Sequence, residues 1–148
     1  MTDLRDAGAD PGSVIRALGL QPHPEGGHYR ETWRDPAPDG ARGAGTAILF
    51  LLAAGETSRW HRVDAAELWI WQAGAPLSLS VEPDTAYRLG PAIADGETLH
   101  GLVPAHAWQS ATSLGGWTLC TCVVAPAFTF SGFEMRRESE SIGASVES

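Results

Sequence analysis

After residue 20 the chain is a succession of short segments rich in β-branched and aromatic residues, and Gly, Pro and Asp separate them. This texture is typical of all-β structure. So many short strands predict a sandwich or a closed barrel, in which every second side chain faces inward. The predicted strands cover residues 28–33, 46–52, 58–61, 67–72, 77–82, 86–89, 98–103, 108–111, 117–124 and 132–136.

The segment before the first strand predicts a short helix. Asp10 is a good N-cap, Pro11 suits the first helical position and Gly19 is a stop signal. A chain of 148 residues has the length of one domain. We therefore expect a flexible N-terminus over residues 1–11, a single domain over 12–136 and a disordered polar tail over 137–148.

Charge and hydropathy argue against several classes of partner. The formal net charge of -8 disfavours nucleic acid, which needs a basic face. No apolar run is long enough for a membrane span, and the N-terminus lacks the features of a signal peptide. Cys120 and Cys122 share one face of a predicted strand and are too far apart to form a disulfide. These features predict a cytoplasmic protein with reduced thiols.

One segment carries two ionisable residues at the spacing of a known motif. It begins at Gly55, ends at Gly74 and places His61 and Glu67 between them. The spacing resembles the first motif of the cupin superfamily, G-x5-H-x-H-x3-E-x6-G, with Val63 in place of the second His. The resemblance implies an all-β fold, a cupin jelly-roll β-barrel with a short N-terminal helix. The turn between the two strands can then bring Glu67 beside His61 in the interior.

A second motif bears on metal binding. Residues 104–109 resemble the second cupin motif, P-x-G-x-x-H, with Gln109 where the third metal-binding His would stand. Because an amide oxygen is a weaker ligand than imidazole for borderline metals, we favour a pocket without a cofactor. The alternative is a divalent Fe, Mn, Zn or Ni ion held by His61, Glu67 and Gln109. Residues that could complete such a set by type are His23, His28 and His100.

A third segment narrows the resemblance. The sequence HPEGG at residues 23–27, together with residues 60–64 and 122–134, resembles the HPEGG-containing "cupin five" family, formerly a domain of unknown function. The resemblance spans roughly residues 12–136, and Ala127 departs from the Gly that the family usually carries. It implies a barrel that is usually paired into a homodimer, with a small-molecule pocket at the cupin motif. It implies no particular reaction.

Without a metal, His61 is the expected general base or acid, and Glu67 is the carboxylate that orients it. Alternation places Arg59 on the face of His61, where it would favour an anionic ligand. For all these residues the structural alternative is a hydrogen-bonded, packing or turn role. The candidates for substrate binding are Arg59, Gln109, Trp69, Trp71, His23, Glu25 and Tyr29.

Three functions are compatible with these residues. The interior His–Glu pair favours an enzyme that performs acid–base chemistry, of the isomerase, epimerase or lyase type, on a polar or anionic metabolite. A non-catalytic cupin that binds a metabolite would also need such a pocket. A metal-dependent cupin oxygenase or decarboxylase is the third alternative.

Overall fold

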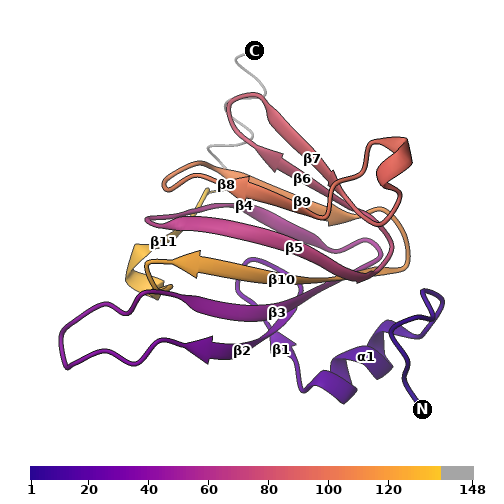
Figure 1. The fold of residues 1–148 in the computed structure, drawn as a ribbon, viewed down its shortest axis with the longest axis horizontal. Coiled ribbons are helices and arrows are strands. Elements are labelled where there is room, and N and C mark those ends of the chain that lie inside the picture. The colour runs from indigo at the N-terminus through magenta and orange to yellow at the C-terminus, as the bar shows by residue number, and fades with distance from the viewer. Residues whose placement is uncertain (138–148) are drawn as a thin grey trace.

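Two antiparallel sheets pack face to face in the computed structural model, which describes residues 1–137 (Figure 1). One sheet has the strand order β1-β2-β3-β10-β5-β8, and the other has the order β11-β4-β9-β6-β7. The fold is a jelly-roll barrel. The strands are β1 (Gln21–Pro22), β2 (His28–Arg34), β3 (Thr46–Ala53), β4 (Thr57–Val63), β5 (Ala66–Gly74), β6 (Leu77–Val81), β7 (Thr85–Leu89), β8 (His100–Val103), β9 (Gln109–Ser113), β10 (Trp117–Ala125) and β11 (Phe133–Met135).

Helix α1 (Pro11–Leu18) has the predicted caps. The Asp10 side chain accepts a hydrogen bond from the Ser13 backbone N–H, and Gly19 ends the helix with a left-handed φ of 66°. The helix covers the outer face of the first sheet, where Val14 packs in a cluster with Leu51, Trp117 and Leu119. None of the helices within residues 1–137 is long and apolar enough to cross a bilayer.

The main core lies between the two sheets. Alternation along β3 and β10 sends Phe50 and Cys120 into the barrel, whereas Leu51 and Leu119 face the helix. Trp69 on β5 packs edge-on against Phe50, with ring centroids 5.5 Å apart. This core closes one part of the barrel and leaves space for a cavity elsewhere in the interior.

Every predicted strand has a counterpart, with ends that differ by one or two residues. The short strand β1 was not predicted, and it extends the first sheet beyond β2. A one-turn 3-10 helix, η2 (Phe130–Gly132), delays the start of the last strand to Phe133. Cys120 and Cys122 are buried free thiols, as expected. The predicted tail falls, from residue 138, outside the described residues.

Candidate functional site

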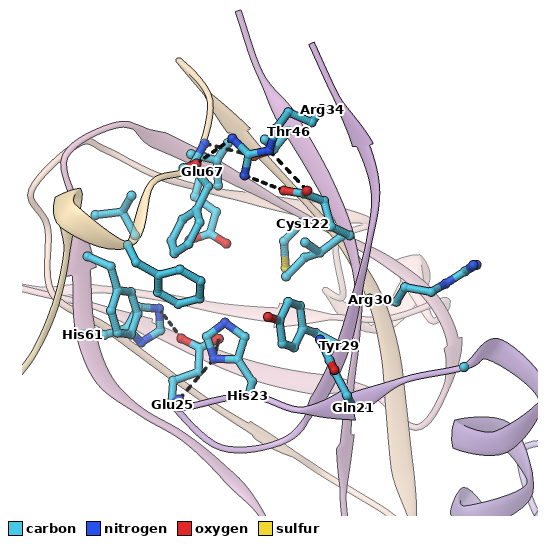
Figure 2. A pocket seen from close by; sticks show the side chains of 18 residues that line it. Gln21, His23, Glu25, Tyr29, Arg30, Arg34, Thr46, His61, Glu67 and Cys122 are labelled. Atoms are coloured by element: carbon cyan, nitrogen blue, oxygen red, sulfur yellow. Dashed lines mark hydrogen bonds and ion pairs between the residues drawn. The ribbon is translucent and has the colours of Figure 1, made fainter. Parts of the chain in front are cut away.

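A cavity of about 460 Å³ enters the barrel between the two sheets. Its floor is polar, and His61 from β4 and Glu67 from β5 meet there with His23 and Glu25 from the turn after β1. Its walls come from β2, β3, β10 and the segment that leads into β11. Figure 2 shows His23, Glu25, His61 and Tyr29 converging on the same space. The aromatic and aliphatic wall residues are Tyr29, Ile48, Val63, Val124, Phe128, Phe130 and Phe133.

The turn at residues 23–27 places Glu25 inside the barrel. Gly26 and Gly27 have φ angles of 111° and 78°, which favour glycine. A Cβ atom on Gly26 would lie 2.2 Å from the Thr57 carbonyl oxygen, so this backbone packs directly against the start of β4. The backbone N–H of His23 donates a hydrogen bond to the Gly27 carbonyl oxygen at 2.9 Å, and this bond closes the turn. The local sequence thus drives an acidic side chain into the interior.

Arg59 fastens this turn from outside the cavity. Its backbone N–H donates to the Glu25 carbonyl at 2.8 Å, and its guanidinium donates to the carbonyls of Pro24 and Glu25. Sequence alternation placed Arg59 on the His61 face, and this expectation was wrong. A β-bulge in the pairing of β4 with β9, between Ser58 and His61, breaks the alternation and leaves Arg59 exposed.

His61 is held at both ring nitrogens. Its Nε2 lies 2.7 Å from Glu25 Oε2, and its Nδ1 lies 2.7 Å from the Arg59 carbonyl oxygen. A carbonyl and a carboxylate both accept, so this arrangement suits a doubly protonated, cationic ring. Burial alone would lower the pKa of His61, but the Glu25 carboxylate outweighs it and raises the pKa to about 9. His61 and His23 likewise hold the pKa of Glu25 below its usual value in spite of burial.

His23 has the opposite character. The Glu25 backbone N–H donates to its Nδ1 at 3.1 Å, so Nδ1 is unprotonated and a neutral ring carries its proton on Nε2. Burial lowers the pKa of His23, which outweighs the attraction of Glu25, and the nearby His61 lowers it further. The free nitrogen points toward the middle of the cavity (Figure 2). His23 therefore presents a neutral N–H donor to whatever binds.

Glu67 is oriented by a buried chain of hydrogen bonds. The Trp69 indole N–H donates to Gln109 Oε1 at 2.8 Å, and the Gln109 amide donates to Glu67 Oε1 at 2.8 Å. An indole can only donate, so it fixes which end of the amide faces Glu67. Burial raises the pKa of Glu67 to about 7; His61 opposes this shift and Glu25 adds to it. Glu67 is thus a cavity carboxyl group poised near neutrality.

The structure sorts the predicted site residues into two groups. His61, Glu67, His23, Glu25 and Tyr29 border the cavity. Gln109 and Trp69 are almost wholly buried behind Glu67 and do not line it, although they were expected to bind substrate. Their side chains form the hydrogen bonds that orient Glu67 instead.

Two further expectations need correction. Glu67 was expected to orient His61, but Glu25 makes that contact. Trp71 was expected in the pocket, but four residues along an extended strand carry it about 13 Å from Glu67, and its indole donates to the Ala75 carbonyl. Nor do His28 and His100 line this cavity.

Some lining residues were not assigned to the site from the sequence. Cys122 was considered only as a reduced thiol, but it also borders the cavity beside Glu67. Phe128, Phe130 and Phe133 form an aromatic wall, with ring centroids 5.0 to 6.1 Å apart. The alternation of Phe128 and Phe130 was the available signal, because residues two apart in an extended segment face the same side.

The donor set does not fit the metal of a typical metallocupin. Val63 offers no ligand atom, both ring nitrogens of His61 are engaged, and Gln109 is bonded at both ends of its amide. Within residues 1–137 no group of three or more His, Cys, Asp or Glu side chains is arranged to hold a metal ion. The residues of this cavity therefore do not form the metal centre of a typical metallocupin.

The family model described as "Cupin superfamily (DUF985)" matches residues 12–136. The chain belongs to this cupin family. It is similar to a solved protein from Shewanella oneidensis, at 35% identity and a TM-score of 0.84, with 92% of this chain and 89% of that one covered. A hypothetical protein from Leishmania major is 28% identical, with a TM-score of 0.82 and 94% of each chain covered.

More distant cupins share the fold alone. The DMSP lyase DddQ from Ruegeria pomeroyi is 14% identical, with a TM-score of 0.52, and the match covers 84% of this cupin and 54% of the lyase. No curated protein matches the chain. The comparisons thus establish the family and the barrel.

Proposed function

We propose that this cupin is an acid–base enzyme of the isomerase, epimerase or lyase type, in which Glu67 exchanges a proton with a small polar substrate in the cavity. The observation that carries the proposal is the geometry of Glu67. Gln109 fixes one oxygen of its carboxyl group, and the residue borders the cavity. A general base works best when its pKa is close to the operating pH, and burial raises the pKa of Glu67 to about 7.

The neighbouring side chains have complementary roles in this proposal. The His61 ring, bonded to both Glu25 and the Arg59 carbonyl, is a fixed positive charge rather than a free base. It stabilises the ionised form of Glu67 from within the same floor. The neutral His23 N–H can donate to a substrate oxygen on which negative charge develops as Glu67 removes a proton from carbon. The DMSP lyase of similar fold indicates only that a cupin barrel can host a lyase.

Exchange of carbon-bound hydrogen with solvent tests the proposal and does not require the substrate to be identified first. The protein is incubated in D₂O with pools of polar metabolites, and mass spectrometry identifies any compound that gains deuterium or is converted. We expect the rate to rise with pH up to about 7, as Glu67 ionises. Glu67→Gln keeps the shape of the side chain and should slow exchange by about 100-fold or more.

The matched control is Glu134→Gln, since Glu134 is an exposed carboxylate that pairs with Arg62 away from the cavity. This variant should exchange at the wild-type rate. Equal rates in the wild-type protein and the Glu67→Gln variant would contradict the proposal. Retention of an unaltered metabolite, with no exchange of its hydrogens, would instead favour a binding protein.

A further inference from the structure

We infer that the cavity accepts a small organic cation with an alkylated ammonium group, and that the charge of this group lies beside Glu67. This inference takes the site from the proposed function and specifies the class of molecule that it binds. It replaces the anionic ligand that Arg59 suggested from the sequence, because Arg59 lies outside the cavity.

The supply of positive charge in the cavity is limited. The chain has ten arginines and no lysine, so no lysine can reach into the cavity. Arg34 at the cavity edge is paired with Glu31 at 2.6 Å and also donates to the Phe128 carbonyl. Arg30 borders the cavity, but its guanidinium points away from His23, Glu25 and His61 (Figure 2). With His61 paired to Glu25, the described residues place no uncompensated cation on the polar floor of the cavity beside Glu67.

Glu67 is the carboxyl group of the cavity floor that has no cationic bonded partner. The bonded partner of Glu67 on the cavity floor is the neutral amide of Gln109, whereas Glu25 has the cationic His61. When Glu67 ionises, the floor therefore gains a negative charge that no arginine neutralises. Such a floor repels an anion and attracts a cation, and the effect is strong because the site is buried.

The aromatic wall of the cavity favours one kind of cation. A bare ammonium group needs three hydrogen-bond acceptors, whereas an alkylated one is recognised by aromatic rings together with a single negative charge. The wall provides Phe128, Phe130 and Phe133. Tyr29 lines the side of the cavity next to His23, and the ring centroids of Tyr29 and His23 are 4.6 Å apart. Phe130 is 56% exposed, which leaves its ring accessible to an entering molecule.

Three probes of nearly the same shape and different charge test the inference by calorimetric titration of the intact protein. They are choline, 3,3-dimethylbutan-1-ol and 3,3-dimethylbutanoate. At pH 8 we expect choline to bind roughly tenfold more tightly than the neutral alcohol, and the anion to bind most weakly. Glu67→Gln should reduce the preference for choline to about twofold or less, whereas Glu134→Gln should keep it.

A second measurement compares pH 6 with pH 8. The titratable groups that face Glu67 are His61 from β4, Glu25 from the turn and Cys122 from β10. Of these groups and Glu67, only Glu67 changes charge between the two pH values, because the pKa of His61 is about 9, that of Glu25 is lowered and that of Cys122 is raised well above its usual value. Burial lowers the pKa of His23, the other histidine of the cavity, so its ring is neutral at pH 8, and the Glu67→Gln variant measured at both pH values isolates the contribution of Glu67. The preference for choline should therefore be smaller at pH 6.

The outcomes separate this inference from the proposed function. Equal affinities for the three probes, tighter binding of the anion, or no binding of choline would overturn the cation assignment. Cation-selective binding in a protein that exchanges no substrate hydrogen would retain it and contradict the proposed chemistry. Hydrogen exchange confined to neutral or anionic compounds would support the proposed acid–base chemistry and contradict the cation assignment.

Discussion

The Glu25 carboxylate lies 2.7 Å from Nε2 of His61, so a residue of a turn, and not Glu67 of the next strand, balances the buried imidazole. This pairing separates two carboxylates that a motif alone would not distinguish. Glu25 is committed to an ion pair, and Glu67 is left as the carboxyl group whose protonation can change at neutral pH.

The His61–Glu25 pair should make stability depend on pH above neutrality. The pKa of His61 is raised from 6.5 in the unfolded chain to about 9 in the folded protein, so its contribution is complete below pH 6.5 and is lost as pH rises through 9. Glu25→Gln leaves the buried ring without its partner and should cost about 3–5 kcal/mol at pH 6.5. Urea unfolding at pH 6.5, 7.5 and 9 measures both effects. The gap between the two proteins should narrow toward pH 9, and a constant gap would refute the pairing.

Glu67 should produce a separate pH dependence at lower values. Its pKa is raised from 4.5 to about 7 on folding, so the folded state favours the protonated acid. The associated stability is complete below pH 4.5 and declines as pH rises through 7. Glu67→Gln resembles the protonated acid and should remove this decline between pH 5 and 7. If wild-type and variant unfolding curves keep the same spacing throughout that interval, Glu67 is not a perturbed carboxyl group.

Gly26 should tolerate no side chain, for a reason beyond its φ angle. Gly26→Ala places a Cβ atom 2.2 Å from the Thr57 carbonyl, whereas Gly55 has a φ of 80° with no atom within 4 Å of the added Cβ. Gly55→Ala should cost about 1–2 kcal/mol from backbone strain alone. Gly26→Ala should cost clearly more, because the turn must also move away from β4. Similar losses in the two variants, measured by denaturant unfolding, would show that the close approach is unimportant.

The sequence was sufficient for the barrel and for part of its floor. Turn residues between apolar segments predict the strands, and the spacing of the first cupin motif predicts that His61 and Glu67 share the interior. These two predictions depend on local periodicity and on distances along paired strands. Glu25 as the partner of His61 could not be predicted in this way, because its position depends on two glycines in left-handed conformations.

Departures from regular geometry account for the other differences. Arg59 leaves the face of His61 at a β-bulge, which depends on the pairing of β4 with β9 rather than on the sequence of β4 alone. The wall formed by Phe128, Phe130 and Phe133 spans an irregular segment and a 3-10 turn, where no single periodicity applies. Trp69 was assigned to ligand binding as an aromatic wall and Gln109 as a hydrogen-bonding group, yet they bond to each other.

The homodimer implied by the family resemblance is a further prediction. Strand β1 pairs with β2 only at Tyr29 and His28, so the outer edge of the later residues of β2 has no paired strand within residues 1–137. Trp33 on this strand is 46% exposed. Covering such an edge with a second copy would satisfy its backbone groups. Light scattering after size exclusion should give twice the monomer mass of 15.7 kDa, and a monomer at micromolar concentration would contradict the dimer.

The Arg59 guanidinium should stabilise the turn that carries Glu25. Its guanidinium bonds the carbonyls of Pro24 and Glu25, and its own carbonyl accepts from His61. Arg59→Met keeps the aliphatic stem and the backbone bonds but removes the guanidinium, which should lower the free energy of unfolding by about 1–2 kcal/mol. Arg16→Met is the matched control, because Arg16 makes only an exposed contact with Asp10 at 4.0 Å and should change stability by less than about 0.5 kcal/mol. Since the turn also places His23 and Glu25, Arg59→Met should weaken choline binding as well, although Arg59 does not touch the cavity. Unchanged stability and unchanged binding would show that the glycines alone hold the turn in place.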